Sequence, residues 1–157
     1  MQKSPLTKAG ESLLRAQLQT LKTTDRQRLR AALEEARAHG DLKENAEYHA
    51  AKEEQGLIEA KISYIEAQLQ TSTVIDTAKL SSDKVIFGAT ITLENIETEE
   101  KTTYKLVGEA ETDMEQGKIS YKSPVAQACI GQAKEDIVSV TTPSGEIEYE
   151  IIDIQYL

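Results

Sequence analysis

Apolar side chains recur at helical spacing along the first forty residues. They are Leu14, Leu18, Leu21, Leu29, Leu33 and Ala36. Spacings of three and four place such residues on one face of an α-helix. Two successive steps of four lead from Leu21 through Asp25 to Leu29, and a stutter of this kind locally unwinds a coiled coil. The pattern predicts a long helix from about Thr7 to His39, roughly 50 Å in length.

A second apolar stripe follows Gly40. Its members are Ile58, Ile62, Ile65 and Leu69, continued toward the N-terminus by Ala50, Ala51 and Leu57. Each predicted helix is apolar on one face only, so each needs a partner, and the short glycine-containing break favours antiparallel pairing. We therefore expect residues 1–73 to form an antiparallel coiled-coil hairpin with an acidic tip at residues 40–45.

From Val74 onward the pattern changes to short runs rich in β-branched residues, which are typical of strands. The runs are Val85–Phe87, Ala89–Leu93, Thr103–Val107, Lys118–Tyr121, Asp136–Thr141 and Glu146–Ile154. Between the last two, Pro143-Ser144-Gly145 is typical of a hairpin turn. These features predict a sheet of mostly antiparallel strands.

One short helix is expected among these strands. Ser123 and Pro124 supply an N-cap and a proline at the first helical position, ahead of Val125–Ile130, and Gly131 marks the end. Residues 74–157 are therefore expected to form a small α+β domain in which the strands pack against one helix. The fold class as a whole is α+β.

The net charge of −9 is unevenly distributed along the chain. Residues 1–73 hold 11 basic and 11 acidic side chains, whereas residues 74–157 hold 7 basic and 16 acidic ones. Because negative charge repels a phosphate backbone, nucleic-acid contacts are expected from the N-terminal half. The acidic half is better suited to a protein partner.

The single cysteine, Cys129, excludes an internal disulfide and any cysteine-based zinc site. Free cysteines usually behave as small buried apolar residues, and we expect this of Cys129. There is no run of 18 apolar residues, and the first twelve residues lack the apolar core of a signal peptide. The protein is expected to be soluble, cytoplasmic and monomeric.

Asp41 and Glu44 stand three residues apart at the predicted hairpin tip, and two interpretations of the pair remain open. In the structural one, Gly40 ends the first helix, Asp41 caps the second and Glu44 completes a capping box. In the functional one, two exposed carboxylates are carried on a rod into another molecule. Mg²⁺ is often held by only one or two protein carboxylates, so the pair could help complete a metal site there.

The residues around this pair resemble the tip signature of the GreA/GreB family of transcript-cleavage factors. The matching string is Gly40-Asp41-Leu42-Lys43-Glu44-Asn45-Ala46-Glu47-Tyr48-His49. Further segments similar to the family's C-terminal domain follow in order. They are Val85–Thr90, Ser123-Pro124 with Ile130-Gly131, Thr142–Glu146, and Glu148–Leu157.

This resemblance implies an FKBP-like C-terminal domain that docks on the rim of the RNA polymerase secondary channel. The matching docking residues are Ser123, Pro124, Ile130 and Gly131. The coiled coil would enter the channel, where Asp41 and Glu44 would share a catalytic Mg²⁺ with the polymerase and help activate water. Asn45 and Tyr48 would assist at the tip. The polymerase would then cut the displaced 3′ end of a backtracked RNA, so that the factor is an activator rather than an enzyme.

Basic residues near the tip also have two interpretations. Arg26, Arg30 and Arg37 share one helical face, and Lys52 lies about two turns beyond the tip on the other helix. They could form a solvated flank with salt bridges across the seam. By resemblance, Arg37 and Lys52 match the family's patch for the RNA 3′ segment, and so sparse a patch favours the GreA type over GreB.

Several alternatives compete with this interpretation. His39 and His49 flank the tip, but their spacing suits a zinc site poorly and supplies no third ligand. A prolyl isomerase would fit an FKBP-like fold, although residues 74–157 offer only Phe87 and four tyrosines for an aromatic pocket. A structural coiled-coil adaptor and a Gfh1-like channel inhibitor are further possibilities. The intact Asp41…Glu44 pair favours cleavage over inhibition.

Overall fold

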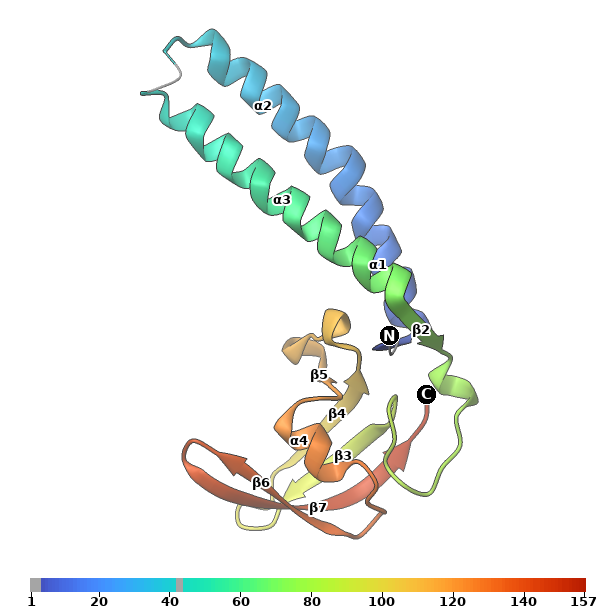
Figure 1. Cartoon of the computed structure of the whole chain (residues 1–157). Coiled ribbons are helices and arrows are strands. Elements are labelled where there is room, and N and C mark those ends of the chain that lie inside the picture. The colour runs from blue at the N-terminus through green and yellow to red at the C-terminus, as the bar shows by residue number, and fades with distance from the viewer. Residues whose placement is uncertain (1–3, 42–43) are drawn as a thin grey trace. The chain divides into compact units, whose positions relative to one another are not determined.

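The structure is a computed structural model that describes residues 4–41 and 44–157 (Figure 1). Leu42 and Lys43, which belong to the predicted tip, lie outside the described residues. The chain divides into two compact units. One is a helical hairpin of residues 12–71, and the other combines the described residues up to Glu11 with residues 72–157. None of the described helices is long and apolar enough to cross a membrane.

The hairpin confirms the predicted helical pairing. Its elements are α1 (Lys8–Thr20), a π-helical segment (Leu21–Asp25), α2 (Arg26–Ala38) and α3 (Ala46–Thr71). α3 runs antiparallel to α2 (Figure 1). The buried residues of the seam are Leu14, Leu21, Leu29, Leu33, Ala36, Ala51, Ile62 and Ile65. The prediction was wrong for Ala50 and Leu57, which are exposed. The face of α3 that meets α2 passes through Ala51 and Ile58, two other predicted members of the stripe.

The π-helical segment lies where the stripe steps irregularly, between Leu21 and Asp25. A π-helical turn contains an extra residue, which leaves backbone carbonyls without their usual partner. The hydroxyl of Thr23 donates to the Gln19 carbonyl at 2.8 Å, and that of Thr20 donates to the Ala16 carbonyl at 3.2 Å. Leu21 at the start of the segment and Leu29 beyond it are both buried in the seam.

Five strands form the main sheet of the other unit, in the order β5-β4-β3-β7-β6. Their bounds are β3 (Thr90–Asn95), β4 (Lys101–Val107), β5 (Lys118–Ser120), β6 (Ile137–Thr142) and β7 (Gly145–Gln155). All neighbours are antiparallel except β4 and β5. The turn at Pro143 and Ser144 connects β6 to β7, as predicted.

The short helix α4 (Pro124–Cys129) covers this sheet and confirms the predicted α+β domain (Figure 1). The Ser123 hydroxyl accepts the Ala126 N–H at 3.3 Å, so the predicted N-cap is correct. The buried core of the domain consists of Val85, Ala89, Ile91, Leu93, Leu106, Ile119, Ala126, Cys129, Val138 and Ile151. Core positions of β3 alternate with half-buried ones, as the period of a strand requires.

Val85–Phe87 does not form the predicted strand. Its backbone instead bonds to the loop that follows α4. The Val85 N–H donates to the Gln132 carbonyl and the Gly131 N–H donates to the Val85 carbonyl, both at 2.8 Å. A turn follows at Gly88, where φ is 90°. Within this run only Val85 is buried, and it belongs to the core without being part of a strand.

The N-terminal residues belong to the same unit as the sheet, which differs from the predicted division at residue 73. β1 (Ser4–Thr7) pairs in parallel with β2 (Ser72–Ile75), and Leu6 is only 1% exposed. The Glu111 carboxylate accepts the N–H groups of Thr7 at 3.0 Å and Gly108 at 2.8 Å. A Cβ at Gly10 would lie 1.8 Å from this carboxylate, so a larger residue there would displace the Glu111 side chain from these bonds.

Candidate tip and basic groove

The second helix of the hairpin is capped by Asn45. α3 begins at Ala46, and the Asn45 Oδ1 accepts the Tyr48 N–H at 3.0 Å, which is the bond that an N-cap side chain makes to the third helical residue. The Asn45 main-chain carbonyl accepts the His49 N–H at 3.1 Å. The predicted cap at Asp41 with Glu44 in a capping box was therefore wrong, because the helix begins four residues later.

The Asn45 side chain also contacts the end of the first helix. Its Nδ2 donates to the Ala36 carbonyl at 2.5 Å. Ala36 lies in the last turn of α2, and its carbonyl also accepts the His39 N–H at 3.2 Å. His39 and Gly40 end that helix, and Gly40 has a φ of 125°, as predicted for a closing glycine. One amide thus forms hydrogen bonds both to an N–H group of α3 and to a carbonyl of α2.

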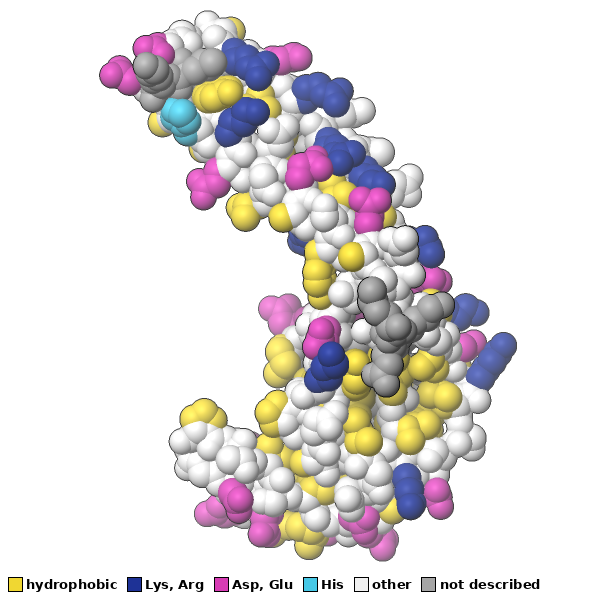
Figure 2. Space-filling model, viewed as in Figure 1, with side chains coloured by type: hydrophobic (Ala, Val, Ile, Leu, Met, Phe, Trp, Pro, Cys, Tyr) yellow, Lys and Arg dark blue, Asp and Glu magenta, His cyan; other side chains and the backbone are white. Residues whose placement is uncertain are grey.

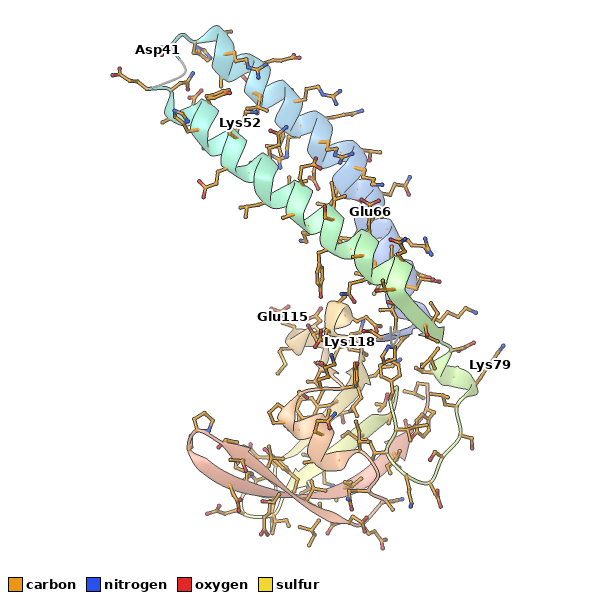
Figure 3. The ribbon with its side chains drawn as sticks, in the orientation of Figure 1. Asp41, Lys52, Glu66, Lys79, Glu115 and Lys118 are labelled. Atoms are coloured by element: carbon orange, nitrogen blue, oxygen red, sulfur yellow. The ribbon has the colours of Figure 1, made fainter. Side chains whose placement is uncertain are left out.

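Asp41 and Glu44 are exposed in the segment between these helix ends. Figure 3 shows Asp41 at this end of the hairpin. Together with His39, Asn45, Ala46 and Glu47 they line one open pocket. Within the described residues, no group of three or more His, Cys, Asp or Glu side chains is close enough together to hold a metal ion. The tip therefore presents two accessible carboxylates while Asn45 caps α3.

A groove of about 350 Å³ lies between α2 and α3 on the same hairpin. Leu29, Leu33 and Ile58 contribute its apolar lining. Its basic members are Arg26, Arg30, Arg37 and Lys52. On the face drawn in Figure 2, Lys and Arg side chains follow one another along the hairpin, with carboxylates interspersed among them. The structure thus brings Arg37 and Lys52, predicted from different helices, into one groove together with Arg30.

Three ion pairs across the seam already engage some of the basic side chains of the hairpin, which are then less available to bind phosphate. They are Lys22–Glu66, Arg26–Glu59 and Arg28–Glu54, with N–O distances of 3.0, 2.8 and 2.6 Å. The Arg26 guanidinium makes two hydrogen bonds to Glu59, which hold the pKa of that carboxyl below its usual 4.5. Arg26 is therefore neutralised within the hairpin, which matches the salt-bridge interpretation for this one residue.

Arg37 lies beside an aromatic ring at the tip. Its guanidinium carbon is 5.9 Å from the centre of the Tyr48 ring, and His49 packs edge-on against the same ring at 5.6 Å. A cation within about 6 Å of a tyrosine face is attracted by the ring quadrupole. Tyr48 thus supports Arg37 from the first turn of α3. The Lys52 ammonium group donates to the side-chain oxygen of Gln55 at 3.5 Å, which leaves its charge unpaired by that contact.

The four predicted docking residues gather around α4 but differ in exposure. Pro124 and Gly131 are exposed, whereas Ser123 caps the helix and Ile130 packs partly against the core. Tyr121 lies just before them and packs edge-on against Phe87, with ring centres 5.5 Å apart. Docking at this surface remains a prediction, and Pro124 is the predicted residue most available for it.

Two features of the site were missed by reasoning from the sequence. Arg30 was assigned to the right helical face but not to the groove, because its neighbours from α3 depend on how the two helices pair. Asn45 was considered only a helper near the tip. Asparagine is about as favourable as aspartate at the N-cap, so Asn45 could have been recognised as a candidate start of the second helix.

Comparison with known families identifies both parts of the chain. Residues 4–74 match the model described as "Transcription elongation factor, N-terminal", and residues 80–156 match "Transcription elongation factor, GreA/GreB, C-term". The chain belongs to the GreA/GreB family of transcription elongation factors. The resemblance seen at the tip therefore extends over nearly the whole chain, and the coiled-coil hairpin with an FKBP-like domain is the fold expected of it.

Relatives within the family are similar along their full length. "Transcription elongation factor GreA" of Thioalkalivibrio sulfidiphilus is 51% identical, with all of both chains covered, and that of Acinetobacter baumannii is 49% identical with the same coverage. Among solved structures, the Gfh1 protein of Thermus thermophilus is 28% identical, covers 98% of this chain and 99% of its own, and superposes with a TM-score of 0.45. The relatives at about half identity are thus named GreA rather than Gfh1.

Proposed function

We propose that this GreA-family factor binds RNA polymerase, inserts its hairpin into the secondary channel and stimulates cleavage of the RNA 3′ end in backtracked or arrested complexes. In this role it activates the intrinsic cleavage activity of the polymerase and is not itself the enzyme. It would act as a monomer in the cytoplasm, where bacterial transcription takes place. Family membership supports the general role, and the tip supports the specific one.

The observation that carries this proposal is the division of roles at the tip. Asn45 caps α3, whereas Asp41 and Glu44 remain exposed at the end of the hairpin. Because Asn45 supplies the cap of α3, the carboxylates of the pair are not required for it. Two accessible carboxylates at the end of a helical hairpin are suited to joining ligands that another molecule provides.

A shared Mg²⁺ fits the chemistry of this pair. Carboxylate oxygens are the ligands that Mg²⁺ prefers, and one or two protein carboxylates commonly suffice when phosphates complete the coordination. Asp41 and Glu44 would hold such an ion jointly with the polymerase, since two exposed carboxylates bind it weakly alone. When bound there, the ion would supply Lewis-acid stabilisation and lower the pKa of a coordinated water. The contribution of the chain is to bring two negative charges to the site.

The groove supports contact with the extruded RNA 3′ segment. Arg37 and Lys52 supply positive charge from opposite helices, and Arg30 extends the row away from the tip. Phosphate contacts of this kind position a nucleic acid without reading its sequence. Because Glu59 already pairs with Arg26, we expect Arg26 to contribute little to RNA binding.

One experiment tests the role of the pair. Asp41→Asn and Glu44→Gln remove a charge each while keeping side-chain size, and neither residue caps α3. Thermal unfolding followed by circular dichroism should therefore match the parent. In cleavage assays on a backtracked transcription complex at low Mg²⁺, each variant should bind polymerase like the parent yet lose most of the stimulation. Raising Mg²⁺ should partly restore it, because a weakened site fills by mass action.

Glu47→Gln is a matched control, since Glu47 is an exposed carboxylate of the same tip pocket in the first turn of α3. It should retain near-parent stimulation. Parent-level cleavage by the Asp41→Asn, Glu44→Gln double variant at low Mg²⁺ would refute the proposal. If the parent slows elongation without producing shortened RNA, the chain is instead a channel inhibitor of the Gfh1 kind.

A further inference from the structure

The Asn45 side chain joins the two helix ends on either side of the tip segment, residues 39–44. Ala36 and Asn45 are nine positions apart, and the bond from Asn45 Nδ2 to the Ala36 carbonyl joins them at 2.5 Å. The same amide accepts the Tyr48 N–H through Oδ1 at 3.0 Å. With the opposite amide orientation, Nδ2 would face an N–H and Oδ1 would face a carbonyl. The two neighbours therefore determine the orientation of the amide.

Asp41 and Glu44 both lie within the segment that this bond closes. A carboxylate on a loop samples many positions unless the ends of the loop are fixed, and closing those ends removes conformational freedom before any ligand binds. The two carboxylates need support of this kind, because they can bind the same ion only if the chain holds them at the right separation. The caps at the two helix ends are thus joined through Asn45, immediately beside the pair.

We propose that Asn45 is a positioning residue whose carboxamide links the ends of α2 and α3 and so holds Asp41 and Glu44 for joint binding of a divalent cation. This inference rests on the proposed function of the pair. Asn45 itself does not contact the cation. Its two hydrogen bonds have different roles, since the bond to Tyr48 starts α3 and the bond to Ala36 closes the segment.

Asn45→Asp separates the two bonds. Aspartate caps a helix about as well as asparagine, so the bond from Tyr48 is kept. An ionised carboxylate has no hydrogen to donate, so the bond to the Ala36 carbonyl is lost. Asn45→Ser provides a second variant without added charge, because serine also caps well but is too short to span both helix ends. Ala50→Gly is the control, since it weakens the exposed side of α3 without touching either bond.

The first measurement uses the whole protein without polymerase. Backbone amide order parameters of Asp41 and Glu44 are measured by ¹⁵N relaxation in the parent and in each variant. We expect a fall toward about 0.6, the range of flexible backbone, in Asn45→Asp and Asn45→Ser but not in Ala50→Gly. Equal order parameters in the parent and both Asn45 variants would overturn the proposal.

The second measurement is the Mg²⁺ dependence of cleavage at saturating factor. For both Asn45 variants, the Mg²⁺ concentration at half-maximal stimulation should rise roughly tenfold, because two carboxylates that are not already held in place must be ordered when the ion binds. Polymerase binding and the rate at high Mg²⁺ should approach the parent values. A parent-like Mg²⁺ midpoint, or an equal shift in Ala50→Gly, would overturn the positioning role. If the parent itself fails to stimulate cleavage, the proposed function fails instead.

Discussion

Arg37, Asn45 and Tyr48 show how few side chains organise the tip. Asn45 joins the two helix ends, and the Tyr48 ring lies beside the Arg37 guanidinium. Asp41 and Glu44 take no part in the cap of α3, so their charge is not needed to start it. The residues that build the tip are therefore separate from those proposed to act there, and substitutions can test the two groups independently.

At the same scale, Cys129 predicts a pH dependence of stability. The thiol is fully buried, and burial raises its pKa from the usual 9.0 to about 11. Between these values the unfolded chain loses the thiol proton while the folded protein keeps it. The contribution of Cys129 to stability is therefore complete below about pH 9 and is lost as the pH rises toward 11.

Cys129→Ala isolates this contribution from other groups that titrate in the same range. Urea titrations give the free energy of unfolding of parent and variant at each pH. The difference between the two should decrease by about 2 kcal/mol between about pH 8 and pH 11, since one pKa unit corresponds to about 1.4 kcal/mol. In native protein at pH 8, the thiol should also resist alkylation. A difference that stays constant across this range would contradict the effect of burial.

At the scale of elements, the hairpin depends on a narrow apolar seam and on charges beside it. Leu29 and Leu33 from α2 pack toward Ile58 and Ile62 of α3, and the π-helical segment lets α1 and α2 share this seam despite the irregular stripe. The ion pairs lie on exposed flanks, where such pairs usually contribute little to stability. The apolar seam should therefore dominate the stability of the hairpin.

Leu29 and Leu57 provide a matched pair for testing the seam. Leu29 is 2% exposed and Leu57 is 66% exposed, although both are leucines of the same hairpin. Leu29→Ala should cost about 2–5 kcal/mol because it leaves a cavity. Leu57→Ala should change stability by no more than about 0.5 kcal/mol. Thermal melts of helical circular dichroism measure both, and equal effects would contradict the packing of the seam.

At the scale of the whole molecule, the two units are expected to divide the work. The hairpin carries the acidic tip and the basic groove, and the other unit carries the α4 surface. A factor built in this way should lose affinity when its docking surface changes and lose maximal stimulation when its tip changes. The N-terminal strand β1 belongs to the unit with α4, so a fragment of residues 74–157 would lack a strand of that unit.

Pro124→Ala in the intact chain tests this division. Pro124 is exposed at the first position of α4, where alanine is tolerated. The factor concentration for half-maximal cleavage should rise about tenfold, which corresponds to about 1.4 kcal/mol of binding, while the maximum stays at the parent value. Pro143→Ala, at an exposed turn proline between β6 and β7, is the control and should change neither quantity. If Pro124→Ala leaves the factor concentration for half-maximal cleavage unchanged, Pro124 is not part of the docking surface.

The sequence by itself determined features that depend on neighbours along the chain. Apolar stripes predicted the two long helices, because burial of one face follows from spacing alone. Ser123 and Pro124 predicted the start of α4, and Pro143-Ser144-Gly145 predicted the last hairpin, since caps and turns are local chemistry. The string at the tip was sufficient to indicate the family.

The tertiary structure decided what depends on distant partners. Asp41 and Asn45 are equally good caps in isolation, and the contact of Asn45 with Ala36 accompanies the start of α3 at Ala46. β1 joined the sheet-containing unit because Ser4–Thr7 pairs with Ser72–Ile75, which is nearly seventy residues away along the chain. The spacing of apolar residues along the sequence contains no information about which distant segments pair. The same limit explains Arg30, whose place in the groove follows from the register of α2 against α3.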